Sequence, residues 1–186
     1  MAKVLLCSAS PRRRELLKKV IAEFDVASSG AEESSLYVRP HLRVMDLALK
    51  KAAGLICDPR IVICSDTLVY KKGKYYGKPK GKEDAFLMLK ELSGVWHSVY
   101  TGVFLKNGEQ IVRFYDRADV LFKKLSDREI QSYIDRFAPY DKAGAYGIQD
   151  GVVVKKYLGS FDTIMGLPTE KLKVYLEKMG VENVCK

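Results

Sequence analysis

The stretch "VLLCSASPRRRELLKKVI" (Val4–Ile21) decides what fold to expect from this 186-residue chain. Val4–Leu6 is a short apolar run that predicts a buried strand, and Pro11–Ile21 has the apolar spacing of a helix. Ser10 is placed to cap this helix, because a serine side chain accepts from the first N–H groups and proline suits the first helical position. A strand, a short loop and a helix in this order form the junction at which α/β folds bind anions.

Three arginines fill the first turn of this expected helix, where the partial positive charge of the helix N-terminus disfavours cations. Successive helical residues point about 100° apart, so two of the three can face one ligand. We therefore expect Arg12 and Arg13 to meet a phosphate and Arg14 to be solvated or packed elsewhere. The alternative is three solvated side chains, each costing about a few tenths of a kcal/mol.

The rest of the chain alternates helical and strand patterns without an internal repeat. Helices are expected over Leu42–Ile56, over Glu83–Leu92, after a capping box of Ser126 and Glu129, and up to a C-cap at Gly180. Strands are expected in "IVICSDTLVY", "VWHSVYTGVFL", "QIVRFYDRADVLF" and "GVVVKKY", with turns at "KKGK" and Asn107–Gly108. This mixture predicts an α/β or α+β fold, with helices on a partly antiparallel sheet, in a single domain of residues 1–186.

Composition narrows the class of partner. The net charge of +9 favours an anionic partner, and either a nucleic acid or a small polyanion fits that charge. The lysines are scattered, and no RNA-binding aromatic signature is present, so nucleic acid is not favoured. No apolar stretch is long enough to span a membrane, which predicts a cytoplasmic protein without a membrane partner. The four cysteines lack metal-ligand spacing and are expected to be small buried hydrophobes in a reducing compartment.

Asp66 is the one charged residue in the apolar run Ile61–Tyr70. A carboxylate inside a strand is costly unless it is paired, exposed or bound to metal. Either Asp66 and Thr67 start a turn, or Asp66 lies at a strand end, where it binds a divalent ion or deprotonates water. Glu32 and Glu33, in the loop after the first helix, are candidates for a second oxygen ligand, although paired acids in a loop are usually only solvated.

The segment "DKAGAYGIQDG" (Asp141–Gly151) is rich in glycine and small residues, which lets backbone approach a ligand closely. Within it, Gln149 carries both a donor and an acceptor and is able to read the edge of a base. A simple connecting loop fits the same pattern.

Eight motifs in order make the chain resemble the Maf family of nucleoside triphosphate pyrophosphatases. They are "LLCSASPRRRELL", the "EE" of the following loop, "LALKKA", "SDT", "GKP", "LSGVWHSVYTGV", "DKAGAYGIQ" and "GSFDTIMGLP". The resemblance implies an α/β fold with an extended mixed β-sheet flanked by helices and two lobes around a central cleft. It also implies cleavage of the α–β phosphate bond with a divalent cation, Mg²⁺ or Mn²⁺, and suggests a homodimer.

The resemblance assigns roles to individual residues. Asp66 matches the family's catalytic carboxylate and, with Glu33, would hold the metal. The positions that match its substrate-binding residues around the triphosphate are Ser8, Arg12, Arg13, Lys51 and Lys78.

Three positions indicate, through the same resemblance, which nucleotide is the substrate. Arg12, Thr67 and Gln149 carry the residues of the branch that hydrolyses dTTP and UTP, with Thr67 and Gln149 expected on the pyrimidine edge. The alternatives are a 7-methyl-GTP pyrophosphatase of the same family and a non-catalytic nucleic-acid or division-machinery binding protein. The chain departs from the family pattern at four places, namely Cys7, Ser65, Asp150 and Thr163.

Overall fold

The computed structural model describes residues 3–30, 34–181 and 184–185, which form one seven-stranded sheet flanked by helices. The strands are β1 (Val4–Cys7), β2 (Asp25–Ala27), β3 (Ile61–Lys71), β4 (Lys74–Tyr76), β5 (Trp96–Asn107), β6 (Gln110–Phe122) and β7 (Val154–Leu158). The α-helices are α1 (Pro11–Lys18), α2 (Pro40–Ala52), α3 (Lys82–Leu92), α4 (Asp127–Phe137), α5 (Phe161–Met165) and α6 (Thr169–Lys178). Short 3₁₀ turns are η1 (Ala53–Leu55), η2 (Ala143–Ala145) and η3 (Ile148–Asp150).

The sheet is mixed, as predicted. Its strand order is β2-β1-β3-β5-β6-β7, with β4 paired to β3. β1 runs parallel to both β2 and β3, whereas the β3–β4 and β6–β7 pairs are antiparallel. The predicted α/β class with an extended mixed sheet flanked by helices is therefore confirmed.

Contacts divide the chain into two compact units. Unit 1 comprises the described residues of Met1–Asp66, Thr101–Asp116 and Gly166–Lys186, and unit 2 comprises Thr67–Tyr100 and Arg117–Met165. The strands β3, β5 and β6 contribute residues to both units. The expectations of a single domain over residues 1–186 and of a central cleft stay predictions.

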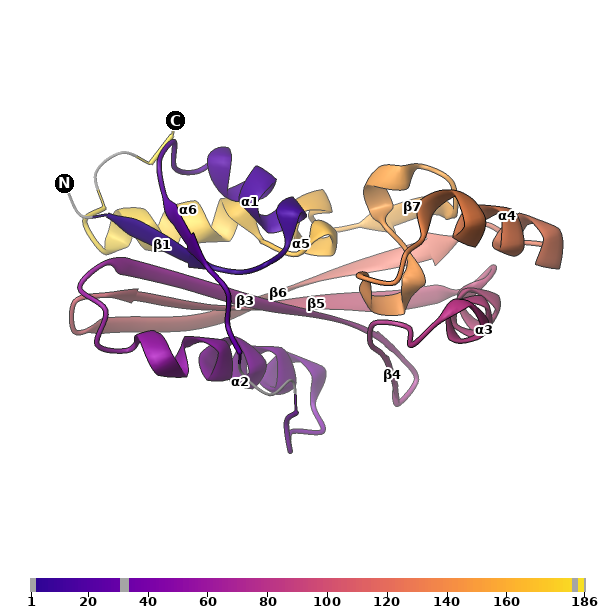
Figure 1. Ribbon diagram of the computed structural model, residues 1–186, viewed down its shortest axis with the longest axis horizontal. Coiled ribbons are helices and arrows are strands. Elements are labelled where there is room, and N and C mark those ends of the chain that lie inside the picture. The colour runs from indigo at the N-terminus through magenta and orange to yellow at the C-terminus, as the bar shows by residue number, and fades with distance from the viewer. Residues whose placement is uncertain (1–2, 31–33, 182–183, 186) are drawn as a thin grey trace. The chain divides into compact units, whose positions relative to one another are not determined.

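Unit 1 has helices on both faces of its strands. α1 and α6 lie on one side of β1 and β3, and α2 lies on the other (Figure 1). The face under α2 is a core cluster of Cys7, Ala48, Ala52, Val62, Cys64 and Phe104. Gly102 of β5 explains how closely α2 approaches, because a Cβ there would lie 2.4 Å from the carbonyl carbon of Val44. Any larger residue at position 102 would displace α2.

Unit 2 pairs α3 with α4. Lys82 bonds Asp135 at 2.7 Å and Lys90 bonds Asp127 at 3.1 Å, both on the exposed surface. α4 begins with the predicted capping box, in which Ser126 and Glu129 bond each other's backbone N–H groups.

Most predicted elements are present, with three informative differences. α1 ends at Lys18 rather than at Ile21, because Ile21 forms an isolated bridge with Val184. The strand β2 and the helix α5 were not predicted, because they are only three and five residues long. β2 is also mostly exposed. The predicted cap is wrong: Ser10 makes no side-chain cap hydrogen bond.

Among the residues described, we find no helix with the length and apolarity that crossing a membrane requires. The four cysteines are free thiols. Cys7 and Cys64 are buried, as expected, whereas the expectation is wrong for Cys57, which is exposed.

Candidate functional site

Asp66 lies in the middle of β3 and is 8% exposed. Its carboxylate forms an ion pair with the ammonium group of Lys51, near the end of α2. The prediction that Asp66 starts a turn is wrong, and so is its predicted place at a strand end. Both side chains are largely buried, and removing one partner of such a pair leaves a charge uncompensated. The structure therefore joins two of the predicted site residues, and both belong to unit 1.

The thiols of Cys7 and Cys64 lie near this ion pair. The register of the parallel strands β1 and β3 pairs Cys7 with Cys64, one residue before Ser8 and two before Asp66 respectively. The Cys7 thiol also contacts the carbonyl of Lys51 at 3.5 Å. A hydrogen bond with Cys7 and burial together raise the pKa of the Cys64 thiol. The Cys64 thiol therefore stays protonated and packs in the core under α2.

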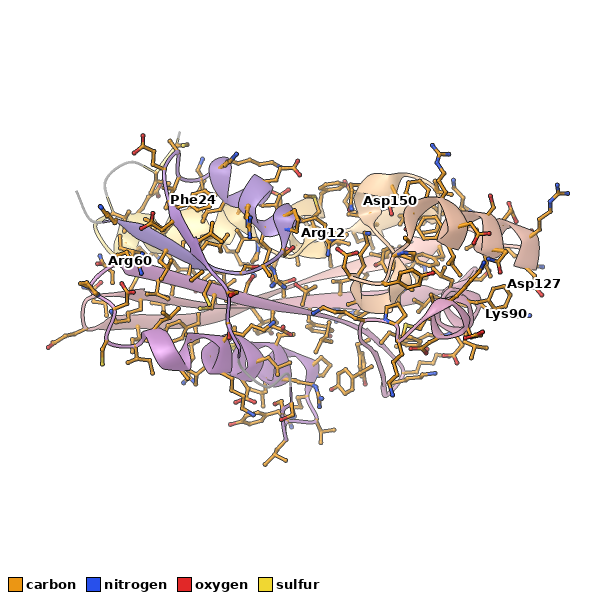
Figure 2. The ribbon with its side chains drawn as sticks, in the orientation of Figure 1. Arg12, Phe24, Arg60, Lys90, Asp127 and Asp150 are labelled. Atoms are coloured by element: carbon orange, nitrogen blue, oxygen red, sulfur yellow. The ribbon has the colours of Figure 1, made fainter. Side chains whose placement is uncertain are left out.

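The N-terminus of α1 is arranged by Ser8 rather than by Ser10. The Ser8 hydroxyl, which is 5% exposed, accepts from the N–H of Ser10 at 3.1 Å. No acidic residue occupies the first turn of α1 to balance its partial positive charge. Arg12, labelled in Figure 2 at this helix start, is half-buried, as is Arg13. Arg14 is exposed, which is the solvated one of its two expected placements.

One backbone carbonyl connects this helix start to the strand that carries the carboxylate. The Gly166 oxygen accepts from Nε of Arg13 at 3.0 Å and from the hydroxyl of Ser65 at 3.1 Å. Gly166 has a φ of 119°, which favours glycine. Ser65 precedes Asp66 in β3, and successive side chains of a strand point to opposite faces of the sheet. The Gly166 carbonyl therefore fixes Arg13 on the α1 side of β3, whereas the Lys51–Asp66 pair lies on the α2 side. The sequence reasoning missed Gly166, and it noted Ser65 only as a departure from the family pattern.

The other three predicted site residues belong to unit 2. Thr67 follows Asp66 in β3 and is half-buried, whereas Lys78 and Gln149 are exposed. Gln149 lies in η3, within the predicted glycine-rich loop. The grouping of these three with the residues of unit 1 stays a prediction.

A buried aromatic cluster forms the interior of unit 2. His97 is 3% exposed and shares a hydrogen bond of 2.9 Å between its Nε2 and the hydroxyl of Tyr146. Both rings meet Phe122 edge to face. Burial lowers the pKa of His97 to about 4, so the imidazole is neutral at pH 7.

The described residues offer a metal ion only part of a coordination shell. Glu32 and Glu33 lie outside them, so the predicted pairing of Glu33 with Asp66 is untested. Nowhere in residues 3–30, 34–181 and 184–185 do three or more His, Cys, Asp or Glu side chains gather as a metal site. A single buried carboxylate nevertheless suits Mg²⁺, which typically takes one or two carboxylates and fills its shell with substrate phosphates and water. Asp66 fits a cation that arrives with a polyphosphate.

These features define an α/β protein that has a buried Lys–Asp ion pair and arginine side chains at the start of a helix. This combination suits a phosphorylated ligand. The profile of the Maf family, described as Maf-like protein, matches residues 3–179, and the chain belongs to this family.

Proteins from three bacteria illustrate the relationship. The dTTP/UTP pyrophosphatase of Caldicellulosiruptor bescii is 42% identical, covering 98% of this chain and 97% of that protein. Proteins of the same name from Clostridium perfringens (strain SM101) and Thermosipho africanus are 42% and 39% identical, each alignment covering at least 96% of both chains. The solved structure of the Staphylococcus aureus Ham1 protein has a TM-score of 0.55 at 12% identity, over 95% of this chain and 99% of that one. This last likeness supports the fold alone.

Proposed function

We propose that this chain hydrolyses dTTP and UTP to the nucleoside monophosphate and pyrophosphate. The observation that carries the proposal is the buried Lys51–Asp66 ion pair in unit 1, and the arginines at the start of α1 supply further positive charge in the same unit. The names of the 39–42% identical relatives support the choice of substrate.

In the proposed reaction, Asp66 orients the attacking water and accepts one of its protons. The water oxygen bonds to the α-phosphorus, and the bridging oxygen between the α and β phosphorus atoms leaves with pyrophosphate. Lys51 is placed to stabilise negative charge near the carboxylate, because it already lies in an ion pair with Asp66.

The polyphosphate is bound by cations from both units in this proposal. Arg12 and Arg13, at the start of α1, hold oxygens of the leaving pyrophosphate, and Ser8 supports the loop that leads to them. Lys78 of unit 2 adds a further positive charge. Their combined charge offsets the negative charge that develops on the leaving group.

A divalent cation, Mg²⁺ or Mn²⁺, belongs to the proposal. Asp66, and Glu33 beyond the described residues, would hold it together with phosphate oxygens. When bound, the cation neutralises phosphate charge and lowers the pKa of a coordinated water.

The pyrimidine is read by Thr67 and Gln149 in this proposal. Gln149 is exposed on its turn, where an incoming base can reach the amide. The alternative substrate, 7-methyl-GTP, remains the competing prediction, and the names of the relatives favour the pyrimidine nucleotides.

The remaining parts of the proposal concern context. We expect the two units to act as one nucleotide pyrophosphatase domain in a cytoplasmic homodimer with a house-cleaning role in nucleotide metabolism. The free thiols of all four cysteines are consistent with a reducing compartment.

The test is pyrophosphate release from a panel of dTTP, UTP, CTP, ATP, GTP and 7-methyl-GTP, with Mg²⁺ or Mn²⁺ and with a chelator. We expect metal-dependent release that is fastest with dTTP and UTP. Faster release from 7-methyl-GTP would assign the other branch. DNA binding that weakens steeply with salt, without hydrolysis of any nucleotide, would replace the enzyme by the binding protein.

A further inference from the structure

The turn that carries Gln149 is fixed by a hydrogen-bonded network from α4. The Tyr133 hydroxyl accepts from the N–H of Gly147 at 3.0 Å and donates to a carboxylate oxygen of Asp150. Tyr133 is 2% exposed, so the network starts from a rigid, buried side chain. Gly147 and Asp150 flank Gln149 on its two sides, so the network holds the turn at both ends.

The amide of Gln149 lies against this network. A Cβ added to Gly147 would lie 2.6 Å from Nε2 of Gln149 and 2.8 Å from Oδ2 of Asp150. The amide nitrogen of Gln149 and the carboxylate oxygen of Asp150 therefore both lie next to the position that a Gly147 side chain would occupy. A carboxylate only accepts hydrogen bonds, so it favours the NH₂ end of the amide on its side. The acceptor oxygen, Oε1, is then turned away from Asp150.

This arrangement bears on which base the amide can bind. Uracil and thymine carry an N–H donor at N3, whereas cytosine carries an acceptor there. We propose that Asp150 and Tyr133 are positioning residues that hold the Gln149 amide with its acceptor outward, and thereby favour uracil and thymine over cytosine. The inference rests on the proposed function, in which Gln149 reads the pyrimidine.

The experiment compares UTP with CTP through the ratio of their kcat/KM values. Asp150→Asn keeps the shape of the side chain but can present its own NH₂ group, so the amide of Gln149 loses its preferred orientation. Gly147→Ala is the second variant: position 147 has a φ of −116°, which alanine adopts, but the new Cβ would lie 2.6 Å from the amide nitrogen, so the amide must move. We expect either variant to lower the UTP/CTP ratio about tenfold, mainly through the KM for UTP, since a base contact is made before the chemical step.

A matched control removes one carboxylate elsewhere in unit 2. Asp127, labelled with its partner Lys90 in Figure 2, lies exposed on α4, the helix that also carries Tyr133. Asp127→Asn should leave the UTP/CTP ratio within about twofold of wild type, because an exposed ion pair contributes little.

A double variant separates positioning from general damage. In a Gln149→Ala background, Asp150→Asn should not change the UTP/CTP ratio further, because the amide that it orients is gone. A structural role of Asp150 would instead slow both nucleotides equally in both backgrounds.

The outcomes distinguish a failure of this inference from a failure of the proposed function. Unchanged UTP/CTP ratios in both Asp150→Asn and Gly147→Ala, or equal use of UTP and CTP by the wild type, overturn the positioning role while pyrimidine hydrolysis stands. A wild-type protein that releases pyrophosphate from neither dTTP nor UTP overturns the proposed function first, and the positioning role with it.

Discussion

The two units of this chain differ in whether their buried polar groups are charged or neutral. Unit 1 keeps formal charges inside: Asp66 is paired with Lys51, and Arg13 is held by the Gly166 carbonyl. Unit 2 keeps its deepest polar groups neutral. His97 shares a hydrogen bond with Tyr146 among aromatic rings.

The difference suits two parts of a nucleotide. A polyphosphate is bound by charge, whereas a base is recognised by oriented donors and acceptors on a rigid support. The comparison predicts that removing charge in unit 1 affects catalysis, and that adding charge inside unit 2 affects stability.

The largest expected change in stability comes from protonating the interior of unit 2. Burial holds the pKa of His97 at about 4 in the folded protein, below the 6.5 of an exposed imidazole, so the unfolded chain binds a proton first as the pH falls. Stability is therefore lost between pH 6.5 and pH 4. One pKa unit corresponds to about 1.4 kcal/mol, so the loss amounts to about 3 kcal/mol.

His97→Gln should remove this part of the pH dependence while keeping a partner for the Tyr146 hydroxyl. The measurement is urea unfolding at pH 7 and at pH 4.5, with His41→Gln as a control that retains His97. Identical slopes of stability against pH in wild type and His97→Gln would show that the imidazole is not held neutral.

The next largest effect should follow from the arginines of α1. Arg13→Ala should lower kcat/KM for dTTP about 10- to 100-fold, because a charge-assisted contact to phosphate is lost. Arg14→Ala removes an equal charge from an exposed neighbour and should change kcat/KM less than about twofold. Equal losses in both variants would mean that only overall charge matters, against a specific phosphate contact of Arg13.

The smallest effect should come from Ser65→Ala. The variant removes one of the two hydrogen bonds to the Gly166 carbonyl, which costs about 1 kcal/mol of stability, and it loosens the support of Arg13. We expect kcat/KM for dTTP to fall about two- to fivefold. Ser98→Ala, which removes a hydrogen bond to Asp119 in unit 2, is the matched control. A larger loss of activity in Ser98→Ala than in Ser65→Ala would contradict the support that Ser65 gives to Arg13.

Several parts of this picture follow from the sequence because the physical signal is local. A carboxylate in an apolar run identifies Asp66, an Asn-Gly pair identifies the β5–β6 turn, and a Ser/Glu spacing identifies the start of α4. Each of these signals depends on residues within a few positions of one another.

Other parts depend on contacts between distant residues. Ser65 meets the carbonyl of Gly166, and Tyr133 meets the backbone of Gly147. A hydrogen bond to a backbone group, whether a carbonyl oxygen or an N–H, leaves no residue type to recognise at the backbone position. The Ser10 cap was wrongly predicted: its side chain makes no cap hydrogen bond, and the hydroxyl that is bonded at this helix start is that of Ser8, which accepts from the N–H of Ser10.

The central claim is that the buried carboxylate of Asp66 drives pyrophosphate release. The direct test is Asp66→Asn, which removes the charge with little change in shape, compared with Asp116→Asn, the acid of a second partly buried Asp–Lys pair in unit 1. Both proteins should remain folded by circular dichroism. The account predicts that Asp66→Asn releases pyrophosphate from dTTP at least about 100-fold more slowly than wild type, while Asp116→Asn stays near wild type. A folded Asp66→Asn protein with a near-wild-type rate would contradict it.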